Sequence, residues 1–215
     1  DKLSNKENSN YETKYKIVKN NEYNNIIKEI ENSKSFGFKF LFENEHYIKS
    51  EILGIGIKTE KNPAYFISFL ENNIKDFSKT FKPYFESEKI EKYGHMLKMD
   101  IFALLKLGIN IKNINFDTMI GSYLLNPAQT NYSINELAKE YLNIYGTDEE
   151  ELLGKGKNKK SFKDLNIESQ AKYIAMTLDF ISKIKEPIKN KIEEQGMKKL
   201  YYDIELPLVE VLATM

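Results

Sequence analysis

The stretch 36–42, which reads Phe-Gly-Phe-Lys-Phe-Leu-Phe, constrains the fold more than any other feature of this sequence. Its four phenylalanines alternate with glycine, lysine and leucine. In an extended chain the phenylalanines therefore share one face, and the three other side chains share the opposite face. The stretch predicts a β-strand with one wholly aromatic face.

The patterns on either side of this strand place most strands before residue 96 and mainly helices after it. Residues 58–63 separate two β runs at a spacing that predicts an antiparallel hairpin. Pro187 is expected to end or kink a long helix. The predicted strands are 15–18, 36–42, 48–57, 64–69 and 90–96, and the predicted helices are 21–31, 71–79, 100–107, 117–125, 134–142, 168–185 and 197–215. This order favours a mixed sheet covered by helices, of the α+β or α/β class.

Composition excludes several classes of site. The chain of 215 residues has no cysteine and two histidines, which excludes disulfides, thiolate metal sites and sites built from several histidines. Acidic and basic residues balance at 32 each, and every basic residue is lysine, so no guanidinium is available to bind phosphate in a bidentate manner. The sequence has no run of eighteen apolar residues and no apolar signal core at its start, and a cytoplasmic location is expected.

Four local motifs suggest chemistry but favour simpler interpretations. Gly154–Asn158 lacks the spacing of a phosphate-binding loop and is expected to be a lysine-bearing loop. The pair Gly54 and Gly56 lacks the third glycine of a dinucleotide fingerprint. His95 is expected to be structural, and Asp148–Glu151 to begin a solvated helix, where carboxylates favour the helix dipole. The residues alone leave no complete catalytic set and predict an α/β domain of unassigned function.

Five segments resemble, in order and spacing, elements of bacterial DNA polymerase I. They are Met96–Asp100 (N-L-K-(Y/F)-D in the family), Phe116–Met119 (F-D-T-M), Leu152–Lys157 (G-K-G-K), Tyr173–Ala175 (Y-A-A) and Ile204–Leu212 (I-E-x-P-L-V-x-V-L). The resemblance covers roughly residues 14–215. It implies the 3′→5′ exonuclease domain of that family, an RNase H-like (DnaQ-like) α/β fold that lies between a 5′ nuclease domain and the polymerase domain.

The resemblance also implies a division of the chain. Residues 1–11 are expected to be a disordered linker or tail, and residues 12–190 the exonuclease-like domain. Residues 191–215 are expected to be the helical start of a polymerase domain that is cut short here.

Proofreading members of the family hold two divalent ions with four carboxylates, and a tyrosine orients the attacking water. The matching positions here are Lys39 and Leu41 for the paired carboxylates of the first strand, Asp100 for the third carboxylate, Tyr173 for the tyrosine and Thr177 for the fourth carboxylate. Three of the four ligands are therefore replaced. We expect no active catalytic residue, no metal site and no cofactor in this chain.

Two nearby carboxylates are poor substitutes for the lost ligands. Asp179 lies six residues after Tyr173, about 240° around a helix, and so faces elsewhere. Glu43 lies one alternate pair beyond Leu41, about 6–7 Å along the strand. Without metal, we expect the Lys39 ammonium to pair with the Asp100 carboxylate and Tyr173 to donate a hydrogen bond to the same group.

The sequence thus predicts a fragment of a DNA-directed DNA polymerase of replication and repair, with a vestigial exonuclease domain in a structural role. The intact polymerase would use magnesium and bind DNA, whereas this fragment is expected to bind DNA weakly or not at all, to be a monomer and to have no membrane contact. Two alternatives stay open: an active 3′→5′ exonuclease with a rearranged metal site, and a stand-alone nucleic-acid-binding module of the same fold.

Overall fold

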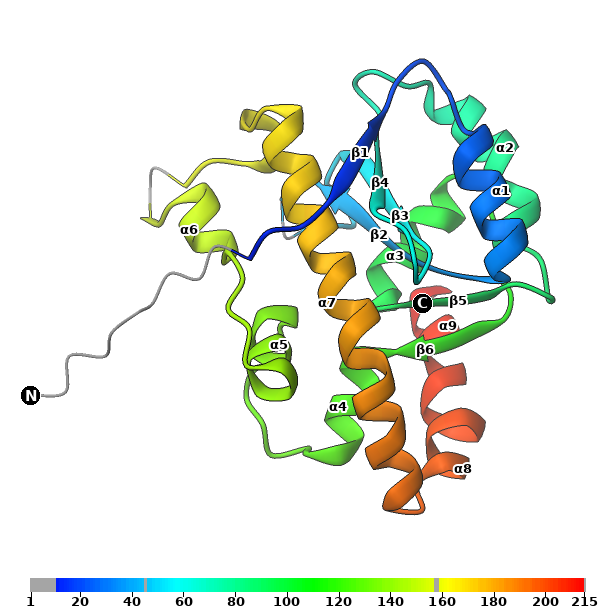
Figure 1. Cartoon of the computed structure of the whole chain (residues 1–215), viewed down its shortest axis with the longest axis vertical. Coiled ribbons are helices and arrows are strands. Elements are labelled where there is room, and N and C mark those ends of the chain that lie inside the picture. The colour runs from blue at the N-terminus through cyan, green and yellow to red at the C-terminus, as the bar shows by residue number, and fades with distance from the viewer. Residues whose placement is uncertain (1–10, 45, 157–158, 215) are drawn as a thin grey trace, which may run out of the picture.

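The computed structural model describes residues 11–44, 46–156 and 159–214, and its centre is a six-stranded mixed sheet (Figure 1). The predicted tail lies outside these ranges except for Tyr11. The strands are β1 (Tyr15–Val18), β2 (Ser35–Phe42), β3 (Ile52–Lys58), β4 (Ala64–Ser68), β5 (Glu91–Gly94) and β6 (Ile114–Asp117). Their order in the sheet is β1-β4-β3-β2-β5-β6. The pairs β2–β3 and β3–β4 are antiparallel, which confirms the predicted hairpin, and the pairs β1–β4, β2–β5 and β5–β6 are parallel.

The aromatic face of β2 forms the centre of one core, as the alternation predicts. All four of its phenylalanines are buried against the helices α1 (Asn24–Ser33), α2 (Ile74–Phe85) and α3 (Leu97–Lys106). The ring of Phe85 meets the rings of Phe36 and Phe38 edge-on, with centroids 5.2 and 5.1 Å away. These edge-to-face contacts fix how α2 lies on the sheet.

The opposite face of the sheet packs against one long helix, α7 (Ile167–Glu194), which crosses it as shown in Figure 1. Gly56 of β3 permits this close approach, because an added Cβ would lie 2.2 Å from Cγ2 of Ile174 and 2.7 Å from Cδ1 of Leu178. The remaining helical segments before α7 are α4 (Thr118–Leu125), α5 (Ile134–Leu142), α6 (Glu149–Leu153) and the 3₁₀ turn η2 (Phe162–Asp164). Of these, α4 and α5 pack directly on α7.

Several predicted boundaries are wrong. The second β run begins at Ile52 rather than at residue 48, and the helix expected over 71–79 spans 74–85. The strand β6 was not predicted at all. Likewise, α7 continues through Pro187 to Glu194 rather than ending near residue 185. The proline costs one backbone hydrogen bond, but Ile184, Ile188 and Ile192 are all buried and hold the turns on both sides of it in the core.

The C-terminal segment packs back onto the sheet domain. It consists of α8 (Lys198–Leu200), a π-helical turn η3 (Tyr201–Glu205) and α9 (Leu206–Thr214). Val209 and Ala213 of α9 are buried in the core cluster that contains the phenylalanines of β2, and α9 contacts α3. The predicted domain boundary at 190–191 falls inside α7, and a division into two domains stays a prediction. Within the described ranges, no helix combines the length and apolar composition needed to cross a membrane.

Candidate functional site

The edge of β2 beyond the end of β5 brings Lys39 and Asp100 together. The parallel pairing of β2 with β5 covers only Ser35–Gly37, so the backbone N–H of Phe40 has no strand partner on that side. It donates instead to Oδ1 of Asp100, at 2.7 Å, from the first turn of α3. The other oxygen of Asp100, Oδ2, lies 2.8 Å from Nζ of Lys39. The predicted ion pair is confirmed.

This ion pair is largely shielded from water. The side chain of Asp100 is 0% exposed and that of Lys39 is 15% exposed. Lys39 also donates to the backbone oxygen of His95, at 3.0 Å. Burial raises the pKa of Asp100 above its ordinary value, while Lys39 and the Phe40 amide favour the charged form and the nearby Asp117 disfavours it. The carboxylate therefore depends on Lys39 to remain charged in this environment.

A second buried carboxylate, Asp117, joins two helix starts. It accepts hydrogen bonds from the amides of Met119 and Ile120 in α4, and from those of Met96 and Leu97 at the start of α3, at 2.8 to 3.3 Å. Burial raises the pKa of Asp117, and these four amides oppose that shift. All four are groups that a helix start leaves without an intrahelical partner, so the role of Asp117 is to cap both helices.

Tyr201, from the π-helical turn, locks the backbone of Asp117. Its hydroxyl accepts from the amide of Asp117 at 2.8 Å and donates to the carbonyl of the same residue at 3.0 Å. The tyrosine side chain is completely buried, and burial raises its pKa well above the ordinary value. The C-terminal segment is therefore tied directly to the residue that caps α3 and α4. The sequence motifs gave no sign of this link.

His95 is buried beside the ion pair and is neutral. Its Nδ1 lies 2.9 Å from Oγ1 of Thr118, whose hydroxyl donates to the carbonyl of Gly94 at 3.3 Å. This arrangement assigns the ring proton to Nδ1. Burial, assisted by the positive charge of Lys39, lowers the pKa of His95 to about 3. The ring is therefore neutral near neutral pH, with its single proton on Nδ1 facing Thr118, and this environment fits the structural role predicted for it.

The other three predicted site residues, Leu41, Thr177 and Tyr173, do not contact the Lys39–Asp100 ion pair through any hydrogen bond. Leu41 is buried in the apolar cluster on the α7 side of the sheet. Thr177 donates to the carbonyl of Tyr173, one turn earlier in α7, at 3.0 Å. The ring of Tyr173 packs on that of Phe162 with centroids 5.0 Å apart. The hydrogen bond expected from Tyr173 to Asp100 is not formed; the donors to Asp100 are Lys39 and the Phe40 amide. Instead, burial and the acidic start of α6 raise the pKa of Tyr173.

Of the two carboxylates considered as substitutes, Asp179 is engaged elsewhere. Asp179 forms an ion pair with Lys58 at 3.2 Å and accepts hydrogen bonds from Thr13 and Tyr11. Asp179 thus lies on the side of α7 that faces Tyr11 and Thr13, which agrees with the predicted angle of about 240° between Tyr173 and Asp179 around the helix. Across the described ranges, no three histidine or acidic side chains lie close enough together to hold a metal ion. One carboxylate facing a lysine does not fit a site for two divalent cations.

The loop that resembles G-K-G-K lies at the surface after α6. Lys155 forms an exposed ion pair with Glu150, at 2.5 Å, and Gly154 and Gly156 both adopt positive φ. The last lysine of the motif, Lys157, lies outside the described residues. The helix predicted over 134–142 is present as α5, and the hydroxyl of Ser133 caps its start by accepting from the amide of Glu136.

The curated proteins that resemble this chain include DNA polymerase I from several bacteria. DNA polymerase I of Chloroflexus aurantiacus is 27% identical over 198 residues, which are 88% of this chain and 21% of that polymerase. The enzymes of Bacillus subtilis and Pseudomonas aeruginosa are 28% identical over 172 residues and 31% identical over 138 residues. The matched part of the chain therefore spans 15–21% of the length of these curated relatives.

Solved structures share the fold at low identity. The chain superposes on Escherichia coli RNase D with a TM-score of 0.72 and 13% identity, over 94% of this chain and 51% of that one. It superposes on a structure of Pol1 from M. smegmatis with a TM-score of 0.73 and 14% identity, over 94% of this chain and 31% of that one. The RNase H-like prediction for the fold is confirmed. Because residues 38–184 match the family described as "DNA polymerase I, ribonuclease H-like domain", the chain belongs to the exonuclease-domain family of bacterial DNA polymerase I.

Proposed function

We propose that this chain is a DNA polymerase I exonuclease domain that has lost its metal-dependent activity and serves as a structural part of the polymerase. One observation carries the proposal: the Lys39 ammonium lies 2.8 Å from Asp100, where the family's aligned positions would hold cations. A resident lysine supplies the positive charge that the buried carboxylate requires. A divalent ion would have to displace it with a single carboxylate as its remaining protein ligand.

The structural role is supported by the contacts of the C-terminal segment. Tyr201 is bonded to the residue that caps α3 and α4, and α9 packs on α3, so the C-terminal segment is firmly attached to the sheet and its helices. In this proposal the intact parent is a cytoplasmic, monomeric DNA-directed DNA polymerase of replication and repair. Magnesium and DNA binding belong to its polymerase domain.

Two measurements on the 215-residue chain test the loss of the metal site. Calorimetric titration with Mn²⁺ is expected to show no binding tighter than millimolar, and single-stranded DNA with a labelled 5′ end is expected to stay intact in Mg²⁺. Micromolar Mn²⁺ binding, or Mg²⁺-dependent release of nucleotides, that disappears in Asp100→Asn would overturn the proposal and favour an active exonuclease. Asparagine at 100 retains an oxygen for the Phe40 amide, so the variant is expected to fold.

Restored ligands provide the matched positive control. Lys39→Asp alone is expected to bind no metal, because Leu41 and Thr177 still supply no carboxylate. The triple variant Lys39→Asp, Leu41→Glu, Thr177→Asp is expected to gain Mn²⁺ binding. Binding by the single variant would show that β2 has been aligned wrongly with the family.

A further inference from the structure

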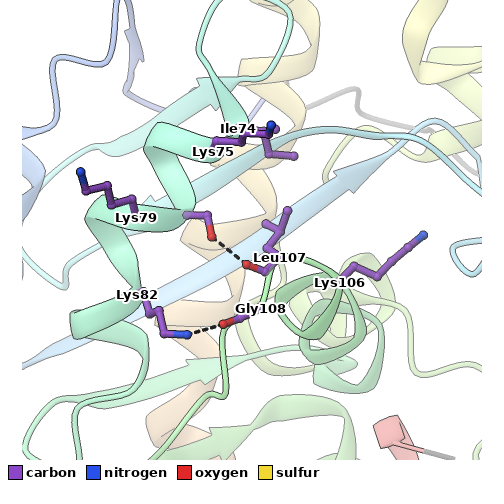
Figure 2. A pocket seen from close by; sticks show the side chains of 8 residues that line it. Ile74, Lys75, Lys79, Lys82, Lys106, Leu107 and Gly108 are labelled. Atoms are coloured by element: carbon purple, nitrogen blue, oxygen red, sulfur yellow. Dashed lines mark hydrogen bonds between the residues drawn. The ribbon is translucent and has the colours of Figure 1, made fainter.

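A surface hollow of about 500 Å³ lies between α2 and the C-terminal end of α3, outside the site described above. Four lysines line it and no acidic residue does: Lys75, Lys79 and Lys82 from α2, and Lys106 from α3. Figure 2 shows Lys79 and Lys106 extending outward at opposite sides of the hollow. Net charge is zero for the chain as a whole, so this one-sided lining is a local departure from its average.

The floor of the hollow is fixed by hydrogen bonds between the two helices. Ser78 donates to the carbonyl of Leu107 at 2.7 Å, and Lys82 donates to that of Gly108 at 2.5 Å (Figure 2). Lys82 also pairs with Glu86 at 3.3 Å, so its charge is balanced.

The other three lysines keep their charge available. Lys75, Lys79 and Lys106 are exposed, and within the described ranges none of them forms an ion pair with a carboxylate. The Lys106 ammonium donates to the carbonyl of Ile48 at 3.3 Å and lies 5.2 Å from the ring centroid of Phe102, and neither contact neutralises its charge. Asp76, which lies between two of them in sequence, instead accepts a hydrogen bond from Asn21. The hollow therefore carries about three uncompensated positive charges.

A second hollow of about 400 Å³ continues the first. The two share Ile74, Lys106 and Leu107, and together they form one groove, which we call the α2–α3 groove. The second part is lined mainly by apolar side chains, among them Leu70, which is 56% exposed, and Phe69. Its one acidic lining residue, Glu51, forms an ion pair with Lys163 at 2.5 Å, which balances its charge. One end of the groove is thus cationic and the other end is apolar.

We propose that the α2–α3 groove binds single-stranded nucleic acid, with phosphates on the three lysines that lack a carboxylate partner and a base against the apolar end. The lysines reach outward around the hollow rather than converging on one point, which suits a chain of phosphates better than a single phosphate group. The flat face of an unpaired base is apolar and can pack against Leu70 and Phe69. Proteins that bind single strands without sequence preference hold bases by contacts of this kind.

This groove is separate from the site around Lys39. Asp100 and Leu107 are seven residues apart on α3, about 10 Å along the helix axis. The proposal therefore does not depend on whether the metal site is active.

Fluorescence anisotropy with a 5′-labelled dT12 tests the groove in the full chain between 50 and 200 mM KCl. The groove variant is Lys75→Gln, Lys79→Gln, Lys106→Gln. The matched control, Lys14→Gln, Lys172→Gln, Lys199→Gln, removes the same charge from exposed lysines elsewhere.

We expect wild-type binding tighter than about 100 μM at 50 mM KCl, a loss of about tenfold or more in the groove variant, and less than about twofold in the control. The slope of log K against log[salt] is expected to fall by about 2 in the groove variant, because each phosphate on a single strand contributes about 0.7. Leu70→Asp is expected to weaken binding as well. Equal losses in the groove and control variants, or tighter binding of polyglutamate than of dT12, would overturn the proposal.

Discussion

Methionine at position 39 would keep most of the side-chain stem of Lys39 and remove its charge. Asp100 would then retain one hydrogen-bond donor, the Phe40 amide, for a carboxylate that is 0% exposed. Breaking a buried pair on one side costs about 3–5 kcal/mol, and the 15% exposure of Lys39 favours the low end. We therefore expect Lys39→Met to lower the free energy of unfolding by about 3 kcal/mol at pH 8. For a chain of this size that corresponds to a Tm lower by about 6–12 °C.

The pH dependence separates charge from packing. Burial already raises the pKa of Asp100 in the folded protein, and removing Lys39 raises it further. A carboxylate whose folded pKa is raised contributes stability that is present below its unfolded pKa and is lost as pH rises through the folded pKa. The variant is therefore expected to approach wild-type stability as the pH is lowered from 8 toward 5, because Asp100 becomes protonated.

Chemical denaturation at pH 5 and pH 8 measures both effects. The double variant Lys39→Met, Asp100→Asn has no charge to strand and keeps an acceptor for the Phe40 amide. It is expected to be more stable than Lys39→Met at pH 8. A cost below about 1 kcal/mol, a cost that is equal at the two pH values, or a double variant that is no more stable than the single one would refute the reasoning.

Three further perturbations follow from the packing. Tyr201→Phe leaves the buried amide and carbonyl of Asp117 without their partner and is expected to cost about 1–3 kcal/mol by urea denaturation; a cost below 0.5 kcal/mol, on the order of an ordinary surface change, would contradict the link. Gly56→Val drives a side chain into Ile174 and Leu178 and is expected to cost about 1–3 kcal/mol by urea denaturation; an unchanged free energy of unfolding would contradict the close packing of α7 on β3. Because the pKa of His95 is lowered to about 3, the neutral ring contributes stability that is complete above the pKa of histidine in the unfolded chain and is lost as the pH falls toward 3. NMR is expected to show a neutral His95 ring at pH 5, and a protonated ring would disprove its burial.

The strands and helices that the sequence predicted correctly are those with strong local periodicity. The alternation in 36–42 determines both faces of β2, because neighbouring side chains in a strand point to opposite sides. The strand β6 has only four residues, and although Ile114 and Phe116 alternate with polar residues, two apolar positions are too few to establish a strand period. It is held by parallel pairing with β5, which depends on residues about twenty positions away. Pro187 misled the prediction for the opposite reason, since a local rule was outweighed by burial of the surrounding isoleucines.

The candidate site was predicted through resemblance rather than through any local pattern. Lys39 and Asp100 are 61 residues apart, and nothing in either neighbourhood specifies the other. The missed residue was Asp117, although an aspartate directly before a helix is a recognisable N-cap signal. Its connection to Tyr201 spans 84 residues and joins the domain to the segment that follows it, so it was beyond the reach of sequence periodicity.

Lys39, Leu41 and Thr177 each fit surroundings in which a carboxylate would be unfavourable without a metal ion. A carboxylate at 41 would enter an apolar cluster, and one at 177 would replace a hydroxyl that already bonds within its own helix. At position 39, a carboxylate would face Asp100 without any cation, and two buried like charges destabilise each other. Each single reversion is therefore expected to be destabilising in the absence of metal. Lysine, leucine and threonine around one buried aspartate are therefore compatible with one another without any metal ion. Because each single carboxylate would strand a buried charge, the Lys39–Asp100 pair is expected to oppose a stepwise change toward a metal-binding set.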